Sequence, residues 1–236
     1  MAAMNLQIHR SNERGRTRLP WLDSRHSFSF GHYYDPKRMG FGALRVINED
    51  IVAPGQGFST HPHANMEIVS IVLEGALAHR DSMGNVETIH AGEVQVMSAG
   101  TGIEHSEFNP RGDVPVHFLQ VWLHPIHCDR PPRYAQKAFA TADQEQRWLP
   151  VVTARARDGS LEIDQDVDIF LTRLAAGTDL RWNLDAGRRG YVQMTKGSAR
   201  LGDTVLSAGD GVAFTTGGEL SLLAEVDAAA VWFDLA

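Results

Sequence analysis

Residues 68–100 read IVSIVLEGALAHRDSMGNVETIHAGEVQVMSAG, and this stretch decides the predicted fold. Two short runs rich in Val and Ile flank a polar segment whose centre is Gly84-Asn85, a typical hairpin signal. Similar apolar runs recur between Gly and Pro residues, as in VHFLQVWL (116–123) and AAAVWFDL (228–235), and helical periodicity is poor nearly everywhere. Short strands with dense turn signals are typical of sandwiches and barrels, so the sequence predicts an all-β fold.

The opening stretch has a second copy in residues 191–218, YVQMTKGSARLGDTVLSAGDGVAFTTGG. Gly75 aligns with Gly197 and Ala91-Gly92 with Ala208-Gly209, although the turn of the second copy is five residues shorter. We interpret the match as an internal duplication of a β-barrel unit.

The proline-rich segment between the copies is typical of a linker. The sequence therefore predicts an N-terminal barrel over 1–130, a linker with a short helix over 131–150, and a C-terminal barrel over 151–236. Thr141 is the expected cap of the short helix and Pro150 its expected stop.

Composition limits the cellular setting and the partners of the chain. The net charge of −7, from 22 Lys and Arg against 29 Asp and Glu, argues against direct nucleic-acid binding. No apolar run reaches the length of a membrane helix, and residues 1–20 lack the apolar region of a signal peptide. The single cysteine, Cys128, excludes an intrachain disulfide. We expect a cytoplasmic monomer with no membrane partner.

Two pairs of polar residues have the spacing of metal ligands. His61 and His63 are two residues apart, so in an extended segment their side chains point to one face. His105 and Glu107 repeat this spacing after a glycine-rich turn. If the two segments are neighbouring strands, three imidazoles and one carboxylate converge, a set suited to Fe, Cu, Ni, Mn or Zn. The sequence thus predicts a mononuclear metal site with positions open to substrate.

The fourth ligand has an alternative. Glu67 lies four residues after His63, on the same face if the strand is regular, and it interrupts an apolar run. Either glutamate could bind the metal while the other supports the site. The remaining histidines receive structural interpretations: His79 and His90 are expected at the surface, His117 as a packed or edge residue, and His124 and His127 without a metal role.

These residues resemble the two motifs of the cupins. Gly55, His61, His63, Glu67 and Gly75 are similar to the first motif, with one extra residue before the last glycine. The second motif is matched by Gly92, Gly100, His105 and Asn109, although Ser98 replaces its proline and the gap before the histidine is longer.

More specifically, the chain resembles the pirin family of bicupins, which have two tandem jelly-roll-like barrels. The resemblance runs through WLDSRHSFSFGHYYDPKRMGFGALRVINEDIVAPGQGFSTHPHANMEIVSIVLEG, DSMGN, MSAGTGIEHSEFNP and PPRYAQKAF. It implies His61, His63, His105 and Glu107 as the metal ligands, and so favours Glu107 over Glu67. An ungapped count places Asn183, Asp185, Leu222 and Ala224 at the corresponding positions of the second half, which is therefore expected to bind no metal.

The bacterial branch of the family implies a quercetin 2,3-dioxygenase activity. A flavonol or related enol and dioxygen would be the substrates, with depside and carbon monoxide as products. One divalent transition metal ion is implied, iron first, with Cu, Mn, Ni, Co or Zn as alternatives. Glu107 would be the catalytic proton acceptor. The aromatic pocket would come from Phe28, Phe30, His32 and Phe58. The alternative function is a non-catalytic, redox-responsive regulatory protein, as in animal relatives.

Overall fold

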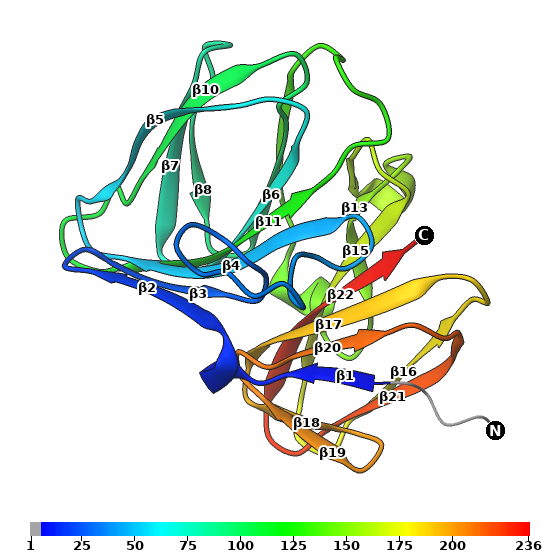
Figure 1. The fold of residues 1–236 in the computed structure, drawn as a ribbon. Helices are drawn as coiled ribbons and strands as arrows, with labels where there is room; N and C mark the ends of the chain where they lie inside the picture. The colour runs from blue at the N-terminus through cyan, green and yellow to red at the C-terminus, as the bar shows by residue number, and fades with distance from the viewer. Residues whose placement is uncertain (1–5) are drawn as a thin grey trace. The chain divides into compact units, whose positions relative to one another are not determined.

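The computed structural model describes residues 6–236 and confirms the all-β fold (Figure 1). The helical segments in these residues are three short 3-10 helices, Ser11–Glu13, Thr141–Gln144 and Arg157–Gly159. None of them approaches the length of a membrane-spanning helix. The chain divides into two compact units. The N-terminal barrel comprises Gly15–Phe139 with Leu161–Gln165, and the C-terminal barrel comprises residues 6–14, Ala140–Ser160 and Asp166–Ala236.

The N-terminal barrel is built from two antiparallel sheets. One has the strand order β12-β9-β6-β11-β4-β3-β2, and the other has the order β5-β10-β7-β8. The strands are β2 (Gly15–Leu19), β3 (Leu22–His26), β4 (Leu44–Val52), β5 (Gly57–His63), β6 (Glu67–Glu74), β7 (Ala76–Asp81), β8 (Val86–His90), β9 (Glu93–Ser98), β10 (Ile103–Phe108), β11 (Val116–Leu123) and β12 (Arg133–Ala138), with the short β14 (Leu161–Glu162) in the same unit.

The C-terminal barrel repeats this arrangement. One sheet contains, in order, β1, β20, β17, β22, β15 and β13, and the other has the order β16-β21-β18-β19. The strands are β1 (Leu6–His9), β13 (Leu149–Thr153), β15 (Val167–Leu174), β16 (Asp179–Leu184), β17 (Arg189–Lys196), β18 (Ser198–Leu201), β19 (Thr204–Ser207), β20 (Gly211–Phe214), β21 (Gly218–Ala224) and β22 (Ala228–Leu235).

The matching strand orders confirm the internal duplication, since β6, β9 and β11 occupy the places that β17, β20 and β22 have in the second barrel. The glycines that align the two copies also match in conformation. Gly75 has φ +79° and Gly197 has φ +66°, in the left-handed region that favours glycine. A Cβ at Gly197 would lie 2.1 Å from the carbonyl oxygen of Asp227, so the turn after each first strand also requires a residue without a side chain.

The N-terminal barrel expected over 1–130 differs at both of its ends from the observed unit, whose main segment is Gly15–Phe139. β1 pairs with β20 and therefore belongs to the C-terminal barrel, whereas β12, expected in the linker, pairs with β9 of the N-terminal barrel. In each case a segment outside the repeated core covers a sheet edge that would otherwise expose unpaired backbone groups. The expected short helix is the 3-10 helix Thr141–Gln144, and the N-cap position is occupied by Ala140 rather than Thr141.

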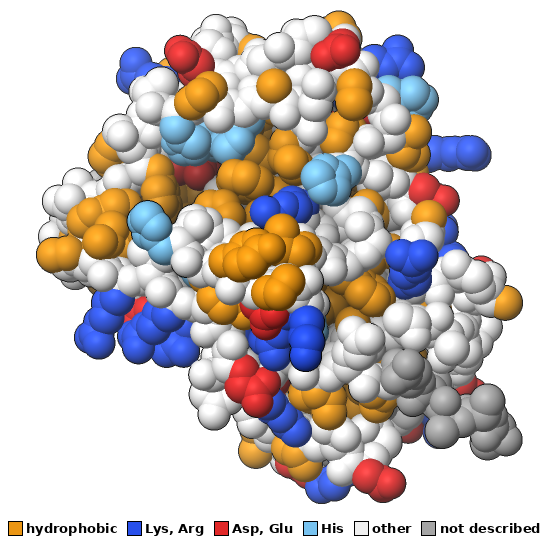
Figure 2. Space-filling view, viewed as in Figure 1, with side chains coloured by type: hydrophobic (Ala, Val, Ile, Leu, Met, Phe, Trp, Pro, Cys, Tyr) orange, Lys and Arg blue, Asp and Glu red, His pale blue; other side chains and the backbone are white. Residues whose placement is uncertain are grey.

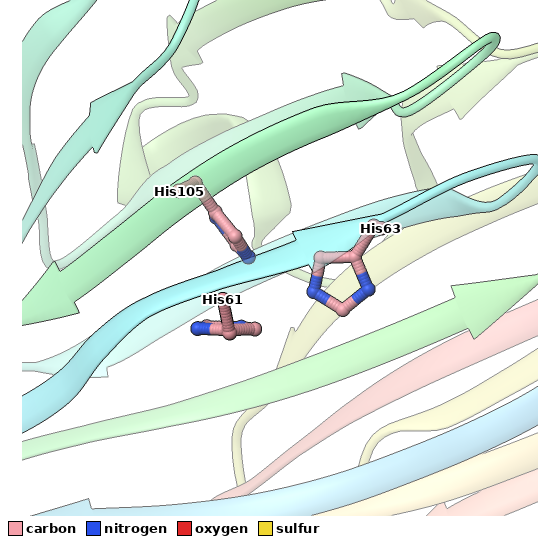
Figure 3. Close-up of side chains that lie close together, drawn as sticks. All are labelled: His61, His63 and His105. Carbon is pink, nitrogen blue, oxygen red and sulfur yellow. The ribbon is translucent and has the colours of Figure 1, made fainter.

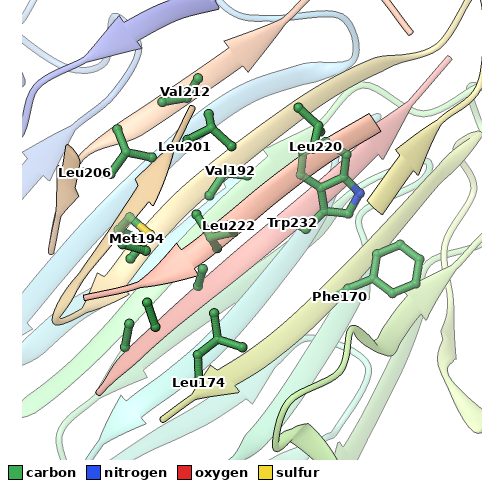
Figure 4. Close-up of a cluster of buried hydrophobic side chains, with 14 of the residues drawn as sticks. Phe170, Leu174, Val192, Met194, Leu201, Leu206, Val212, Leu220, Leu222 and Trp232 are labelled. Atoms are coloured by element: carbon green, nitrogen blue, oxygen red, sulfur yellow. The ribbon is translucent and has the colours of Figure 1, made fainter. Parts of the chain in front are cut away.

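The two barrels differ in what fills them. The C-terminal interior is apolar, with Trp232, Leu220 and Leu222 among its buried side chains (Figure 4). Trp182 and Leu184 of β16 pack there while Asn183 and Asp185 are exposed, so the two residues given by the ungapped count do not point into the barrel. Each fully buried large apolar side chain contributes about 1.5–3 kcal/mol. The N-terminal barrel replaces part of that interior with buried polar side chains, which include His105, Glu107 and His79.

Candidate metal centre

The two predicted ligand pairs lie on adjacent strands of the N-terminal barrel. β5 and β10 are antiparallel neighbours, and His61 lies directly opposite His105 in their register. The period-two geometry of β5 turns His63 to the same side as His61, and the three rings face one another (Figure 3). Ring centroids are 4.5 Å apart for His61 and His105 and 4.9 Å apart for His63 and His105. The strands approach so closely that a Cβ at Gly57 would lie 2.2 Å from the Glu107 carbonyl oxygen.

The nitrogens of these histidines have the features expected of metal ligands. One nitrogen from each of His61, His63 and His105 lies within 4.8 Å of the others. His61 Nδ1–H donates to the carbonyl oxygen of Ser59 at 2.8 Å, which leaves Nε2 unprotonated and able to bind a cation. Within residues 6–236, His63 Nε2 and both ring nitrogens of His105 are buried without a hydrogen-bond partner. Orphaned buried imidazole nitrogens are costly, and a metal ion would satisfy them.

Electrostatics keep two of the imidazoles neutral. Burial, reinforced by the neighbouring histidines, lowers the pKa of His63 to about 4 and that of His105 to about 3. Desolvation penalises the charged imidazolium, and like charges in one cluster penalise it further. Both rings are therefore in the neutral form that coordinates metals at physiological pH.

These pKa values predict how the stability of the metal-free protein depends on pH. An unfolded histidine titrates near pH 6.5. Between about pH 6.5 and pH 3 the unfolded chain therefore binds more protons than the folded chain at His63 and His105. The free energy of unfolding therefore falls as the pH drops through this interval, and it levels off below it. Urea unfolding of metal-free protein at pH 7, 5 and 4 measures the effect. A His63→Leu, His105→Leu double variant should show a shallower dependence, and an identical dependence would contradict the prediction.

Glu107 is buried beside His105. Gln120 Nε2 donates to both oxygens of its carboxylate at 2.9 Å, and Ser70 Oγ lies 3.5 Å from Oε1. Its carboxylate falls within 4.8 Å of ligand nitrogens of His105 and His79, but the three-histidine group does not include it. The pairing of β10 with β5 shifts register between His105 and Glu107, and the extra residue lies on β5. β10 keeps a regular register with β7 here, so Glu107 points to the same side of β10 as His105 but lies opposite Phe58 of β5. Glu107 thus borders the histidine cluster, and its carboxylate is fixed by Gln120.

Glu67 lies elsewhere. β5 ends at His63, Asn65 has φ +49°, and a new strand begins at Glu67, so the regular extension that would place Glu67 beside His63 is interrupted. Its carboxylate accepts a hydrogen bond from Ser98 Oγ at 2.8 Å and lines a separate cavity of about 360 Å³. Burial raises the pKa of Glu67, opposed by its hydrogen bond from Ser98. Among the described residues, no potential metal-binding group includes Glu67.

His79, expected at the surface, is buried, and that expectation was wrong. It lies on β7 between Leu77 and Asp81, which are also buried, and this alternation in the sequence could have revealed its inward orientation. His79 Nε2–H donates to Asp81 Oδ2 at 3.0 Å, and Nδ1 accepts from Gln95 Nε2 at 3.3 Å. Both nitrogens are occupied, so His79 packs beside His105 without a free lone pair for a metal.

Replacing His79 with phenylalanine therefore tests whether this residue is a structural residue or a metal ligand. The His79→Phe protein should retain one metal ion per chain, because the ring that is lost offers no unshared nitrogen. Its free energy of unfolding should fall by about 1–3 kcal/mol, since Asp81 and Gln95 lose a buried partner. Metal analysis and chemical denaturation measure the two effects. Loss of the metal together with an unchanged stability would instead identify His79 as a ligand.

A cavity of about 390 Å³ adjoins the cluster and is lined by both aromatic and polar side chains. Figure 2 shows pale-blue histidine side chains beside a hollow that contains hydrophobic side chains. Of the four residues expected to form the pocket, Phe30 and Phe58 line it, whereas Phe28 is buried outside its lining and His32 is exposed. The sequence interpretation missed the remaining lining residues, which include Trp21, Trp122, Gln120, His26, Asn48 and Asp50.

Comparisons with known proteins agree with this architecture. Residues 7–123 match the family model Pirin, and residues 150–235 match the model Quercetinase C-terminal cupin domain. The chain is 44% identical over 230 residues to quercetin 2,3-dioxygenase of Escherichia coli K12, covering 98% of each protein. It is 36% identical over 217 residues to a pirin-like protein of Caulobacter vibrioides, covering 92% of this chain and 93% of that protein.

Solved structures give the same result. The crystal structure of YhhW from Escherichia coli has a TM-score of 0.95 and 43% identity, covering 98% of both chains. A second crystal structure, of bacterial pirin YhhW in complex with nickel(II), has a TM-score of 0.93 and 43% identity, covering 98% of this chain and 99% of that one. With two cupin barrels and near-complete coverage of curated relatives, the chain belongs to the pirin family, in the branch whose members include enzymes named quercetin 2,3-dioxygenase.

Proposed function

We propose that the protein is a metal-dependent dioxygenase that opens the heterocyclic ring of flavonols such as quercetin. The observation that carries the proposal is the cluster of His61, His63 and His105, with buried nitrogens that lack hydrogen-bond partners in residues 6–236 and adjoin a cavity of about 390 Å³. The names of the E. coli relatives support the substrate class.

Four residues would hold the metal: His61 through Nε2, His63, His105 and Glu107. Three imidazoles and one carboxylate suit a divalent transition ion, and we propose iron, with nickel, copper, manganese, cobalt or zinc as alternatives. The crystal structure of YhhW in complex with nickel(II) supports the binding of a divalent metal. A bound ion would act as a Lewis acid that lowers the pKa of a substrate hydroxyl.

Glu107 would accept the proton of the flavonol 3-hydroxyl. Its carboxylate borders the histidine cluster, and Gln120 holds both of its oxygens in place. Proton transfer to a positioned carboxylate leaves an electron-rich enolate, which is the form of the substrate that reacts with dioxygen. In the overall reaction quercetin and one dioxygen molecule give a depside and carbon monoxide.

The cavity walls would orient a flat substrate. Trp21 packs edge-on against Phe58 at 5.2 Å, and Phe30 packs edge-on against Trp122 at 5.4 Å, so two aromatic pairs line the space beside His61. Aromatic surfaces of this kind bind planar rings and exclude water from the reacting centre.

The test is turnover by protein loaded separately with each candidate metal. Quercetin absorbance should fall with stoichiometric oxygen uptake and carbon monoxide release for at least one ion, and the His61→Ala protein should lose both metal and activity. A metal-loaded protein that turns over no flavonol with any of Fe, Ni, Cu, Mn or Co would refute the proposal and favour the regulatory alternative.

A further inference from the structure

The lining of the cavity includes polar side chains that do not belong to the histidine cluster. We call one group of them the polar strip, and it consists of Thr17, Ser24, His26, Asn48 and Asp50. The strip comes from β2, β3 and β4 of the seven-stranded sheet, whereas the histidine cluster and Glu107 come from β5 and β10 of the four-stranded sheet. A ligand in the cavity would therefore meet polar groups from both sheets of the barrel.

The strip is buried and connected by hydrogen bonds. Ser24, Asn48 and Asp50 are each 3% exposed, and His26 is 1% exposed. His26 Nδ1–H donates to Asn48 Oδ1 at 2.8 Å, so Nε2 accepts from the hydroxyl of Thr17 at 2.9 Å. This arrangement uses the proton of Thr17 within the protein and leaves its oxygen as an acceptor at the cavity.

Such a strip is costly in a barrel interior. Removing several polar side chains from water costs free energy. The same positions also lose the stabilisation that buried apolar side chains would provide. The second barrel is mainly apolar at this place. β15, which has the place of β4, presents Phe170 and Leu174 to the core, with the buried Thr172 between them. The duplicated scaffold thus folds with a largely apolar surface there, and a strip of five polar residues is not required by the fold.

We propose that the polar strip binds a second hydroxyl group of the substrate, so that the site selects polyhydroxylated enols over the same enol with an unsubstituted ring. The proposal rests on the proposed function, in which the metal cluster holds the enol. The strip and Glu107 line the same cavity from opposite sheets, so one substrate could contact both. The Asp50 carboxylate and the Thr17 oxygen accept hydrogen bonds, which suits a phenolic hydroxyl and disfavours an anionic substituent.

The experiment compares quercetin with 3-hydroxyflavone, which has the same enol but no other hydroxyl. Wild-type protein should prefer quercetin in kcat/KM. The Thr17→Val variant keeps the side-chain shape and removes the acceptor, and should lower this preference about threefold to tenfold. Asp50→Asn, which replaces one of the two carboxylate oxygens with an amide NH2, should also lower it about threefold to tenfold. Turnover of 3-hydroxyflavone should fall less than that of quercetin in both variants, and Thr204→Val on β19 serves as the matched control.

An equal loss for both substrates, or an unchanged preference in Thr17→Val, would overturn the proposal. Quenching of tryptophan fluorescence provides a readout independent of turnover, because Trp21 and Trp122 line the cavity. If metal-loaded wild type turns over neither compound, the dioxygenase proposal fails, and the strip is then judged by binding alone. Quercetin should still bind more tightly than 3-hydroxyflavone, with the difference reduced in Thr17→Val, and equal binding of both compounds by wild type would refute the strip as a hydroxyl site.

Discussion

Replacing His105 with leucine is expected to abolish metal binding and dioxygenase turnover while the metal-free protein keeps its stability. Both ring nitrogens of His105 are buried without a hydrogen-bond partner in the described residues, so the metal-free protein loses no polar contact when the ring is replaced by an apolar side chain of similar size. We expect its free energy of unfolding to change by less than about 1.5 kcal/mol. Wild-type protein should instead gain about 2.7 kcal/mol at a free metal concentration one hundred times Kd, and the variant should gain none.

The matched control is His117→Leu. His117 Nε2 lies 3.0 Å from Glu49 Oε1 on β4, outside the histidine cluster. This variant should show the opposite result, with a modest loss of stability and full metal binding. Calorimetric melting with and without metal, together with metal analysis, compares the two variants. A large destabilisation of metal-free His105→Leu with retained metal would show that His105 is a structural residue.

The second large effect is expected from Glu107→Gln. Loss of the carboxylate should lower kcat for quercetin by about a hundredfold to ten-thousandfold, because the amide cannot accept the substrate proton. Metal affinity should fall as well if the carboxylate is a ligand. The Gln120 amide that now donates to both carboxylate oxygens would keep only one acceptor, so the side chain would also lose part of its orientation.

Glu67→Gln is the control for this change, because the two glutamates share chemistry and burial but not position. Glu67 accepts from Ser98 in a separate cavity, so its amide variant should keep metal and turnover close to wild type. Metal stoichiometry and steady-state kinetics on both variants decide between them. If Glu67→Gln lost the metal and Glu107→Gln retained it, the proposed ligand set would be wrong.

Much of the fold was predictable because it depends on local sequence patterns. Short apolar runs, the Gly84-Asn85 hairpin and the aligned Gly75 and Gly197 indicated two β-barrels, since strand length and turn conformation are properties of a few adjacent residues. Domain edges were less predictable. Whether β1 or β12 completes a given sheet depends on which distant strand edge is available for pairing.

The candidate site was likewise predictable in part. The spacing of two residues within HPH and HSE by itself determined that each pair can face one side, and with it the candidate set of three histidines. Only the tertiary structure decided the place of the glutamates, because the left-handed Asn65 interrupts the extension on which the position of Glu67 depended. It also placed His79 against His105, and it brought Gln120 and the polar strip, from strands that the sequence separates, around one cavity. Local spacing sets the direction of a side chain, whereas its partners are set by contacts between distant strands.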